Sequence, residues 1–168
     1  MNITPYQVLG AIVIGGGASV LMDAWNLFLK YALGMPSLNY CLLGRWHLYM
    51  PEGTFFHSNI AAALPRRFEC AAGWVAHYTI GIVLALLFLA LAPADWLERP
   101  TFLGALLYGI GTVVFPLFVL QPALGLGIAS SKAARPVQAR LKSLMTHVVF
   151  GVGLYLCAVA LSHLSVAS

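Results

Sequence analysis

Three ionisable side chains, Asp23, His77 and His147, fall inside stretches of this sequence that are otherwise almost entirely apolar. On membrane-insertion scales such a group costs about 2.5–3.5 kcal/mol, so it is by default a candidate for function. A histidine beside a carboxylate suits proton coupling, because a histidine titrates near neutrality. We therefore predict that Asp23 holds His147, with His77 nearby, and that the pair forms a site rather than a purely structural contact.

Charged residues at the ends of the apolar stretches put the three side chains at a similar depth. Asp23 lies seven residues before Lys30, roughly 10 Å along a helix. The two histidines lie eight and five residues beyond charged ends of their own stretches, roughly 12 and 8 Å. Ser19, Asp23, Asn26 and Lys30 recur at intervals that place them on one helix face, which we expect to face protein rather than lipid.

Other polar side chains could join this site. Gln121 brings an amide to the same membrane face, and Pro116 can kink its stretch by freeing a backbone carbonyl. Arg140 shares a helix face with the histidine that follows it, and the long first connection could contribute Arg45 and His57. The candidate binding residues are Asp23, Asn26, Arg45, His57, His77, Gln121, Arg140 and His147. The alternative for Asp23 is that it extends toward Lys30 or pairs with Arg140, and for each buried histidine it is one interhelical hydrogen bond worth well under 2 kcal/mol. For Arg45 and His57 the alternative is a solvated position.

The elements that must position these residues follow from composition. The chain is 61% hydrophobic and only 8% charged, which is typical of a membrane protein. A spanning helix needs about 20 mostly apolar residues, and four stretches qualify, at about 6–29, 70–91, 101–120 and 141–164. We predict an all-α fold: one membrane domain over 1–168, built as a four-transmembrane-helix bundle. The first stretch lacks a basic n-region and is too long for a signal peptide, so it should remain in the protein.

Lysine and arginine are distributed unevenly between the connections. Four lie in the connection between the first and second stretches and four in that between the third and fourth, whereas the other side holds only Arg99. Positively charged loops stay in the cytoplasm, so both long connections are expected there and both chain ends on the periplasmic side. Because these bases sit at helix ends and not in one patch, no nucleic-acid partner is expected.

Both long connections have features of membrane-interface segments. The segment 36–69 mixes aromatic and basic side chains, which suits amphipathic turns or a lid at the interface. The segment 130–143 is a basic strip that suits anionic headgroups. The lipid bilayer is therefore an expected partner. A small-molecule or ion ligand and a second copy of the chain, in a homodimer, are the other expected partners.

Two pairs of stretches resemble one another. The start of the first stretch, "GAIVIGGGAS" at 10–19, matches "GALLYGIGTV" at 104–113, and "HYTIGIVLAL" at 77–86 matches "HVVFGVGLYL" at 147–156. Two matches in the same order suggest a two-plus-two internal repeat, although Gly-rich apolar helices also align by chance. Independently, Ala11, Gly15 and Ser19 form a small-residue face that lets another helix approach closely.

The remaining chemistry-bearing residues give weak signals. Cys41, Cys70 and Cys157 are odd in number and form no CxxC pair, so we expect isolated reduced thiols. No cofactor is required by the sequence, but His77 and His147 on two helices could ligate a b-type haem or a metal ion.

Five segments carry a resemblance to a known family. They are "MPSLNYCLLGRW" at 35–46, "HSNIAAA" at 57–63, "GWVAHYTIG" at 73–81, "QPALGLGIA" at 121–129 and "LMTHVVFGVGLYL" at 144–156. Together they resemble the bacterial domain-of-unknown-function family 2938. The resemblance implies a small four-helix bacterial inner-membrane protein, and it transfers no catalytic residue because the family has no assigned activity.

Three functions remain open from the sequence. The one we favour is a transporter in which the Asp/His site, near the cytoplasmic side, binds a proton, a cation or a small polar solute. The second is a membrane-embedded enzyme acting on a lipid or quinone-like substrate, with a histidine as base and Arg45 or Arg140 holding an anionic headgroup. The third is a haem-binding or metal-binding membrane protein, and a purely structural role is also open.

Overall fold

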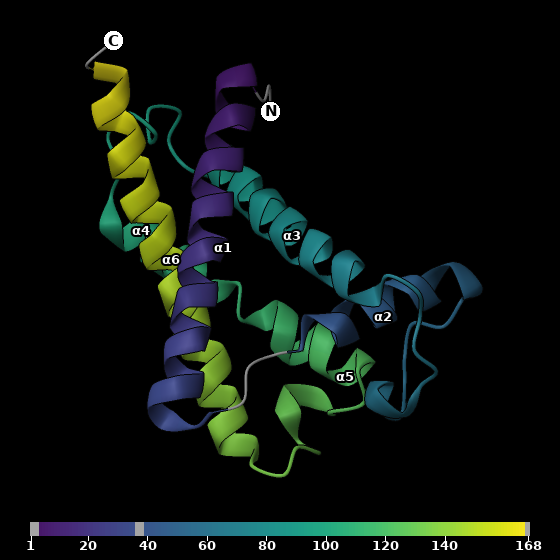
Figure 1. Ribbon diagram of the computed structural model, residues 1–168. Coiled ribbons are helices and arrows are strands. Elements are labelled where there is room, and N and C mark those ends of the chain that lie inside the picture. The colour runs from purple at the N-terminus through teal and green to yellow at the C-terminus, as the bar shows by residue number, and fades with distance from the viewer. Residues whose placement is uncertain (1–3, 36–38, 167–168) are drawn as a thin grey trace. The chain divides into compact units, whose positions relative to one another are not determined.

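The computed structural model describes residues 4–35 and 39–166, and this part of the chain is helical with no strand (Figure 1). Four helices are long and apolar enough to cross a membrane: Pro5–Leu33, Glu69–Leu91, Phe102–Ala123 and Pro136–Leu164. The predicted all-α architecture with four membrane-length helices is therefore confirmed. The first of these is α1 (Pro5–Leu33), the second α3 (Glu69–Leu91), and the fourth belongs to α6 (Pro136–Val166).

Helix α1 is longer than the predicted 6–29 because both of its ends are capped. The Thr4 hydroxyl accepts a hydrogen bond from the Gln7 backbone N–H, and the Gln7 side chain accepts one from the Thr4 N–H, which satisfies two orphan donors at the helix start. At the other end Gly34 adopts a left-handed conformation and donates its N–H to the Leu29 carbonyl, as a C-terminal glycine commonly does.

The third membrane-length helix is interrupted, whereas the sequence predicts a single helix over 101–120. It consists of α4 (Phe102–Gly111), a turn, the π-helical segment η3 (Pro116–Leu120) and the short α5 (Gln121–Ala123). Pro116 has no N–H to donate to the Thr112 carbonyl, so regular α-helical bonding cannot continue through it. The Gln121 N–H instead reaches back five residues to the Pro116 carbonyl, the pattern of a π-helix.

The chain divides into two compact units. The first contains the described residues up to 35, 78–112 and those from 146 onward, and the second contains 39–77 and 113–145. In the first unit, the first residues of α1 and the last described residues of α6 lie at the same end (Figure 1). The core of this unit joins all its helices, with Ile14, Phe150 and Leu154 almost fully buried.

Glycines allow the helices of the first unit to pack backbone to backbone. A Cβ atom added at Gly15 of α1 would lie 2.7 Å from the Gly81 carbonyl oxygen of α3, so the predicted small-residue face is a helix-packing face. In the same way, one added at Gly109 of α4 would overlap the backbone of Gly151 in α6. In the proposed repeat Gly109 corresponds to Gly15 and Gly151 to Gly81, so equivalent residues make equivalent contacts. This supports the internal repeat, which stays a prediction.

The second unit is built on a short helix from the first long connection. Helix α2 (Tyr40–Tyr49) is followed by the 3-10 turns η1 (Met50–Glu52) and η2 (Ile60–Ala62), and a further turn, η4, covers Ile128–Ser130. Helix α2 packs on the first turns of α3 with its Gly44 against the Glu69 carbonyl and with its Tyr40 carbonyl against Gly73.

This close packing joins two of the three cysteines. Cys41 and Cys70 form a disulfide, and Cys157 is free. The expectation of isolated reduced thiols is therefore wrong for the first two. They are 29 positions apart in the sequence, and only the docking of α2 on α3 makes them neighbours.

Candidate functional site

Asp23 lies on α1 and is hydrogen-bonded to a tyrosine of α3. The Tyr78 hydroxyl donates to Asp23 Oδ2 across 3.0 Å, and both side chains are half-buried in the first unit. Asn26, one turn further along α1, is also half-buried. Ser19 has a local role instead, because its buried hydroxyl donates to the Gly15 carbonyl of its own helix at 2.9 Å. Sequence reasoning missed Tyr78, although a phenol at this depth is itself a polar group that needs a partner.

His147 of α6 is hydrogen-bonded to Thr112, the residue that ends α4. The Thr112 hydroxyl donates to the Gly109 carbonyl at 2.6 Å and lies 2.8 Å from His147 Nδ1. A hydroxyl has a single proton to donate, so the nitrogen must be the donor in the second contact. Nδ1 therefore carries hydrogen, and Nε2 is left with the lone pair that can accept a proton.

The predicted pairing of Asp23 with His147 stays a prediction. Both residues belong to the first unit, and the hydrogen bonds described above link them to Tyr78 and Thr112 respectively. Each ionisable side chain thus has a neutral hydroxyl beside it. Sequence reasoning did not identify Thr112 as a partner; its place next to a glycine-rich helix end is the only signal that could have done so.

His77 belongs to the second unit and contacts the aromatic side chains of α2 and α3. Its Nε2 lies 3.3 Å from the Tyr40 hydroxyl, its ring stacks on the Tyr40 ring at 4.4 Å between centroids, and the Trp74 ring lies 6.1 Å away. The Cys41–Cys70 disulfide joins the same two helices. His77 therefore sits at the docking surface between α2 and α3.

Arg45 is a structural residue of the second unit. It is only 7% exposed, and its guanidinium makes a bidentate pair with Glu69 at 2.7 and 2.8 Å. Its remaining nitrogen donates to the carbonyls of Ile60 at 3.2 Å and Ala63 at 2.8 Å. The hydrogen bonds that Arg45 donates to the Glu69 carboxylate raise the pKa of Arg45. These contacts tie the η2 turn to α2 and α3 and use the donors that would otherwise hold an anionic headgroup.

Three further predicted residues lie in the second unit. Gln121 is 8% exposed and donates from Nε2 to Ser143 Oγ at 3.1 Å, while its buried Oε1 has no partner among the described residues. Arg140 donates to the Ala129 carbonyl at 2.7 Å. The His57 ring packs edge-on against Tyr49 at 5.0 Å.

The eight predicted binding residues therefore fall in both units. Asp23, Asn26 and His147 belong to the first, and the other five belong to the second. Among the described residues, no group of three or more His, Cys, Asp or Glu side chains could hold a metal ion. The prediction of one binding site formed by the whole set is untested.

The comparisons with known proteins identify a family. A family model described as "Protein of unknown function (DUF2938)" matches residues 12–161. The match covers most of the chain, so the chain belongs to this family, as the sequence resemblance predicted. The searches of curated proteins and of solved structures found no match.

Proposed function

We propose that this member of the DUF2938 family moves a small solute or ion across a membrane in exchange or together with protons, and that Asp23 carries the proton. The observation that carries the proposal is the hydrogen bond from Tyr78 to Asp23 at 3.0 Å, between two apolar helices of membrane-spanning length. Ionisable residues at such positions commonly mark proton relays and solute pathways.

A hydroxyl partner suits a carboxyl group that must gain and lose a proton. The Tyr78 hydroxyl can donate to a carboxylate and can accept from a protonated carboxyl, so both states of Asp23 keep a hydrogen bond. The contrast is Glu69, whose partner Arg45 can only donate. Protonation of Glu69 would break its bidentate ion pair with Arg45, so Glu69 is expected to stay charged. Asp23 has no such ion pair with Tyr78 and can be protonated while it keeps its hydrogen bond.

Two further features support transport. His147 also has a hydroxyl partner, Thr112, and its Nε2 is the nitrogen that can accept a proton. The helix that ends at Thr112 is broken and continues as a π-helix. Discontinuous helices form the solute and ion sites of many transporters, and π-helical segments frequently occur at functional sites.

For the orientation we keep the charge-based prediction: both long connections in the bacterial cytoplasm, and the chain ends on the periplasmic side of the inner membrane. The disulfide between Cys41 and Cys70 opposes this orientation, because disulfides persist in oxidising compartments and are mostly transient in the cytosol. In this orientation the two cysteines are expected to be reduced in the cell for most of the time.

The test uses the full chain in liposomes that enclose a pH-sensitive dye. Addition of amines, sugars or amino acids from a panel should move protons with at least one solute, and Asp23→Asn should abolish that movement. Asp95→Asn, which removes an exposed carboxylate from the turn before α4, should behave as wild type. Solute-driven proton movement that survives in Asp23→Asn, or its absence in the wild type across the panel, would overturn the proposal.

A further inference from the structure

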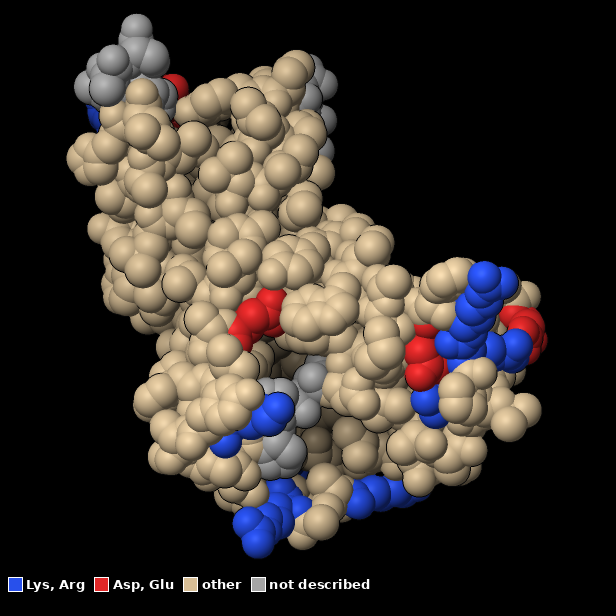
Figure 2. Space-filling model, viewed as in Figure 1, with Lys and Arg blue, Asp and Glu red and all other residues tan. Residues whose placement is uncertain are grey.

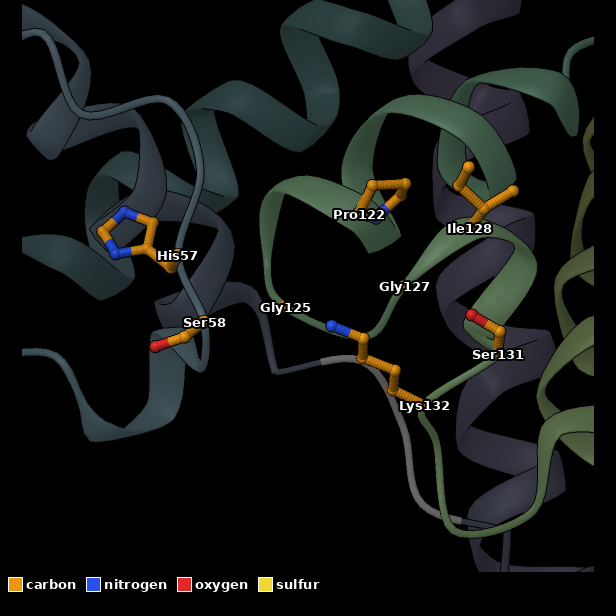
Figure 3. Close-up of a pocket in the computed structure, with 8 residues that line it drawn as sticks. All are labelled: His57, Ser58, Pro122, Gly125, Gly127, Ile128, Ser131 and Lys132. Carbon is orange, nitrogen blue, oxygen red and sulfur yellow. The ribbon is translucent and has the colours of Figure 1, made fainter.

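The second unit contains a cavity that none of the residues discussed as proton carriers lines. Its volume is about 400 Å³, within the usual range of ligand pockets. One wall is the turn at His57 and Ser58, and the other is the loop after α5 (Figure 3). The lining residues are His57, Ser58, Pro122, Gly125, Gly127, Ile128, Ser131 and Lys132.

Backbone contacts hold the two walls in place. The His57 N–H donates to the Ala123 carbonyl at 2.9 Å, and the Ile60 N–H donates to the Leu124 carbonyl at 3.1 Å. Gly125 has a φ of +92°, and a Cβ atom there would overlap the Ser58 carbonyl. Only glycine combines this backbone conformation with so close an approach, so the cavity is preformed by the fold.

Among the lining side chains Lys132 and Ser131 are hydrogen-bond donors, whereas Pro122 and Ile128 are apolar. Figure 3 shows the Lys132 ammonium in the gap between the two walls, while the Ser131 hydroxyl lies further along the loop, near Gly127. The Ser131 hydroxyl also packs against Gly127, whose φ is +73° and where a Cβ atom would overlap it. An ammonium and a hydroxyl from one loop can both donate to the oxygen atoms of a phosphate group.

Lys132 has no acidic partner within the second unit. That unit contains seven Lys and Arg residues and two acidic residues, Glu52 and Glu69, an excess of five positive charges. Glu52 is paired with Arg66 and Glu69 with Arg45. Figure 2 shows one cluster on the visible face in which Lys or Arg side chains touch Asp or Glu side chains. No acidic residue follows Glu98 in the sequence.

We propose that this cavity binds a phosphate group, with Lys132 as the charged ligand and Ser131 as a hydroxyl donor. The group can be carried by an anionic lipid headgroup or by a soluble phosphate, since both present the same oxygen atoms. Its lining residues come from the connection that precedes the second membrane-length helix and from the end of the third one with the connection that follows it. Basic residues close to the ends of such helices commonly bind anionic headgroups. This site is independent of the proton-carrying role of Asp23.

The experiment measures binding to the purified full chain in two arms. Inorganic phosphate is titrated against the detergent-solubilised protein by calorimetry, and phosphatidylglycerol is titrated against the delipidated protein by native mass spectrometry, with phosphatidylcholine as reference. Saturable binding in the first arm identifies a soluble phosphate. Binding of phosphatidylglycerol alone identifies a lipid headgroup.

Matched variants separate this cavity from a general effect of positive charge. Lys132→Gln should weaken binding at least tenfold, whereas Arg135→Gln removes the same charge three residues away, outside the cavity lining, and should change binding less than twofold. Ser131→Ala should weaken binding while leaving the charge intact, and it serves as the second variant if Lys132→Gln does not fold. Equal losses in the Lys132 and Arg135 variants, unchanged binding in the Lys132 and Ser131 variants, or no binding in either arm would overturn the proposal.

Discussion

At the scale of single residues, variants of Asp23 and Tyr78 can tell a functional site from a purely structural contact. Asp23→Asn keeps the size and an acceptor for the Tyr78 hydroxyl, so the free energy of unfolding should fall by about 1 kcal/mol or less. Proton coupling should nevertheless be lost, because an amide does not titrate in this range. Tyr78→Phe should likewise lower the free energy of unfolding by about 1 kcal/mol. Unfolding and transport measured on the same preparations check both, and an inactive Asp23→Asn protein that is also unfolded would indicate a structural role.

The ion pair between Arg45 and Glu69 should behave differently, because its charges are largely buried. Glu69→Gln leaves the guanidinium with neutral acceptors only, and removal of one partner from a buried pair costs about 3 kcal/mol. Glu52→Gln breaks the more exposed pair with Arg66 and should cost less than about 1 kcal/mol. Thermal unfolding in detergent compares the two variants. Similar midpoints would show that the pair between Arg45 and Glu69 stabilises the fold no more than the exposed pair between Arg66 and Glu52.

At the scale of elements, the disulfide depends on the docking of α2 on α3. A side chain at Gly44 would collide with the Glu69 carbonyl, so Gly44→Val should separate the helices and leave Cys41 and Cys70 as free thiols. Alkylation under non-reducing conditions followed by mass spectrometry counts them. Gly16→Ala is the control, since a Cβ atom at Gly16 meets nothing within 4 Å. An intact disulfide in Gly44→Val would mean that the glycine contact does not hold these helices together.

The repeat can be tested on the helices of the first unit. Superposition of α1 and the 78–91 part of α3 on α4 and the 146–166 part of α6 should align Gly15 with Gly109 and Gly81 with Gly151. The matched glycine contacts are the physical reason, because both pairs need the same close helix approach. The sequence alignment also predicts that the two halves are related by a rotation about an axis near the membrane normal. If the best superposition has another register, the hypothesis of an internal duplication is wrong.

At the scale of the whole molecule, the open question is which side of the membrane the long connections face. The charge distribution predicts that a reporter after Ser168 reads as external and that one near Ala133 reads as cytoplasmic. Membrane-impermeant thiol reagents, applied after mild reduction of intact cells, should then fail to label Cys41 and Cys70. Labelling of both cysteines together with a cytoplasmic C-terminus would show that the orientation is the opposite one. The disulfide would then lie in an oxidising compartment, where it can persist.

Much of the architecture could be predicted because it follows from local properties of the chain. Apolar stretches of about 20 residues, broken by charges and prolines, determine four membrane-length helices whatever their neighbours. The glycine spacing of α1 likewise indicates a packing face, since a missing side chain allows close approach to any helix. Asp23 and His147 could be singled out for the same reason: a polar group in an apolar helix is visible in the sequence alone.

The partners of those groups were decided by tertiary structure only. Tyr78 is 55 residues from Asp23 and Thr112 is 35 from His147, and no periodicity relates residues on different helices. The disulfide was missed because it depends on how α2 docks, and the engagement of Arg45 by Glu69 and the η2 carbonyls could not be read from a basic residue in a connection. Helix formation depends on neighbours along the chain, whereas these contacts depend on how helices are placed beside one another, which the sequence encodes only through the packing of the whole fold.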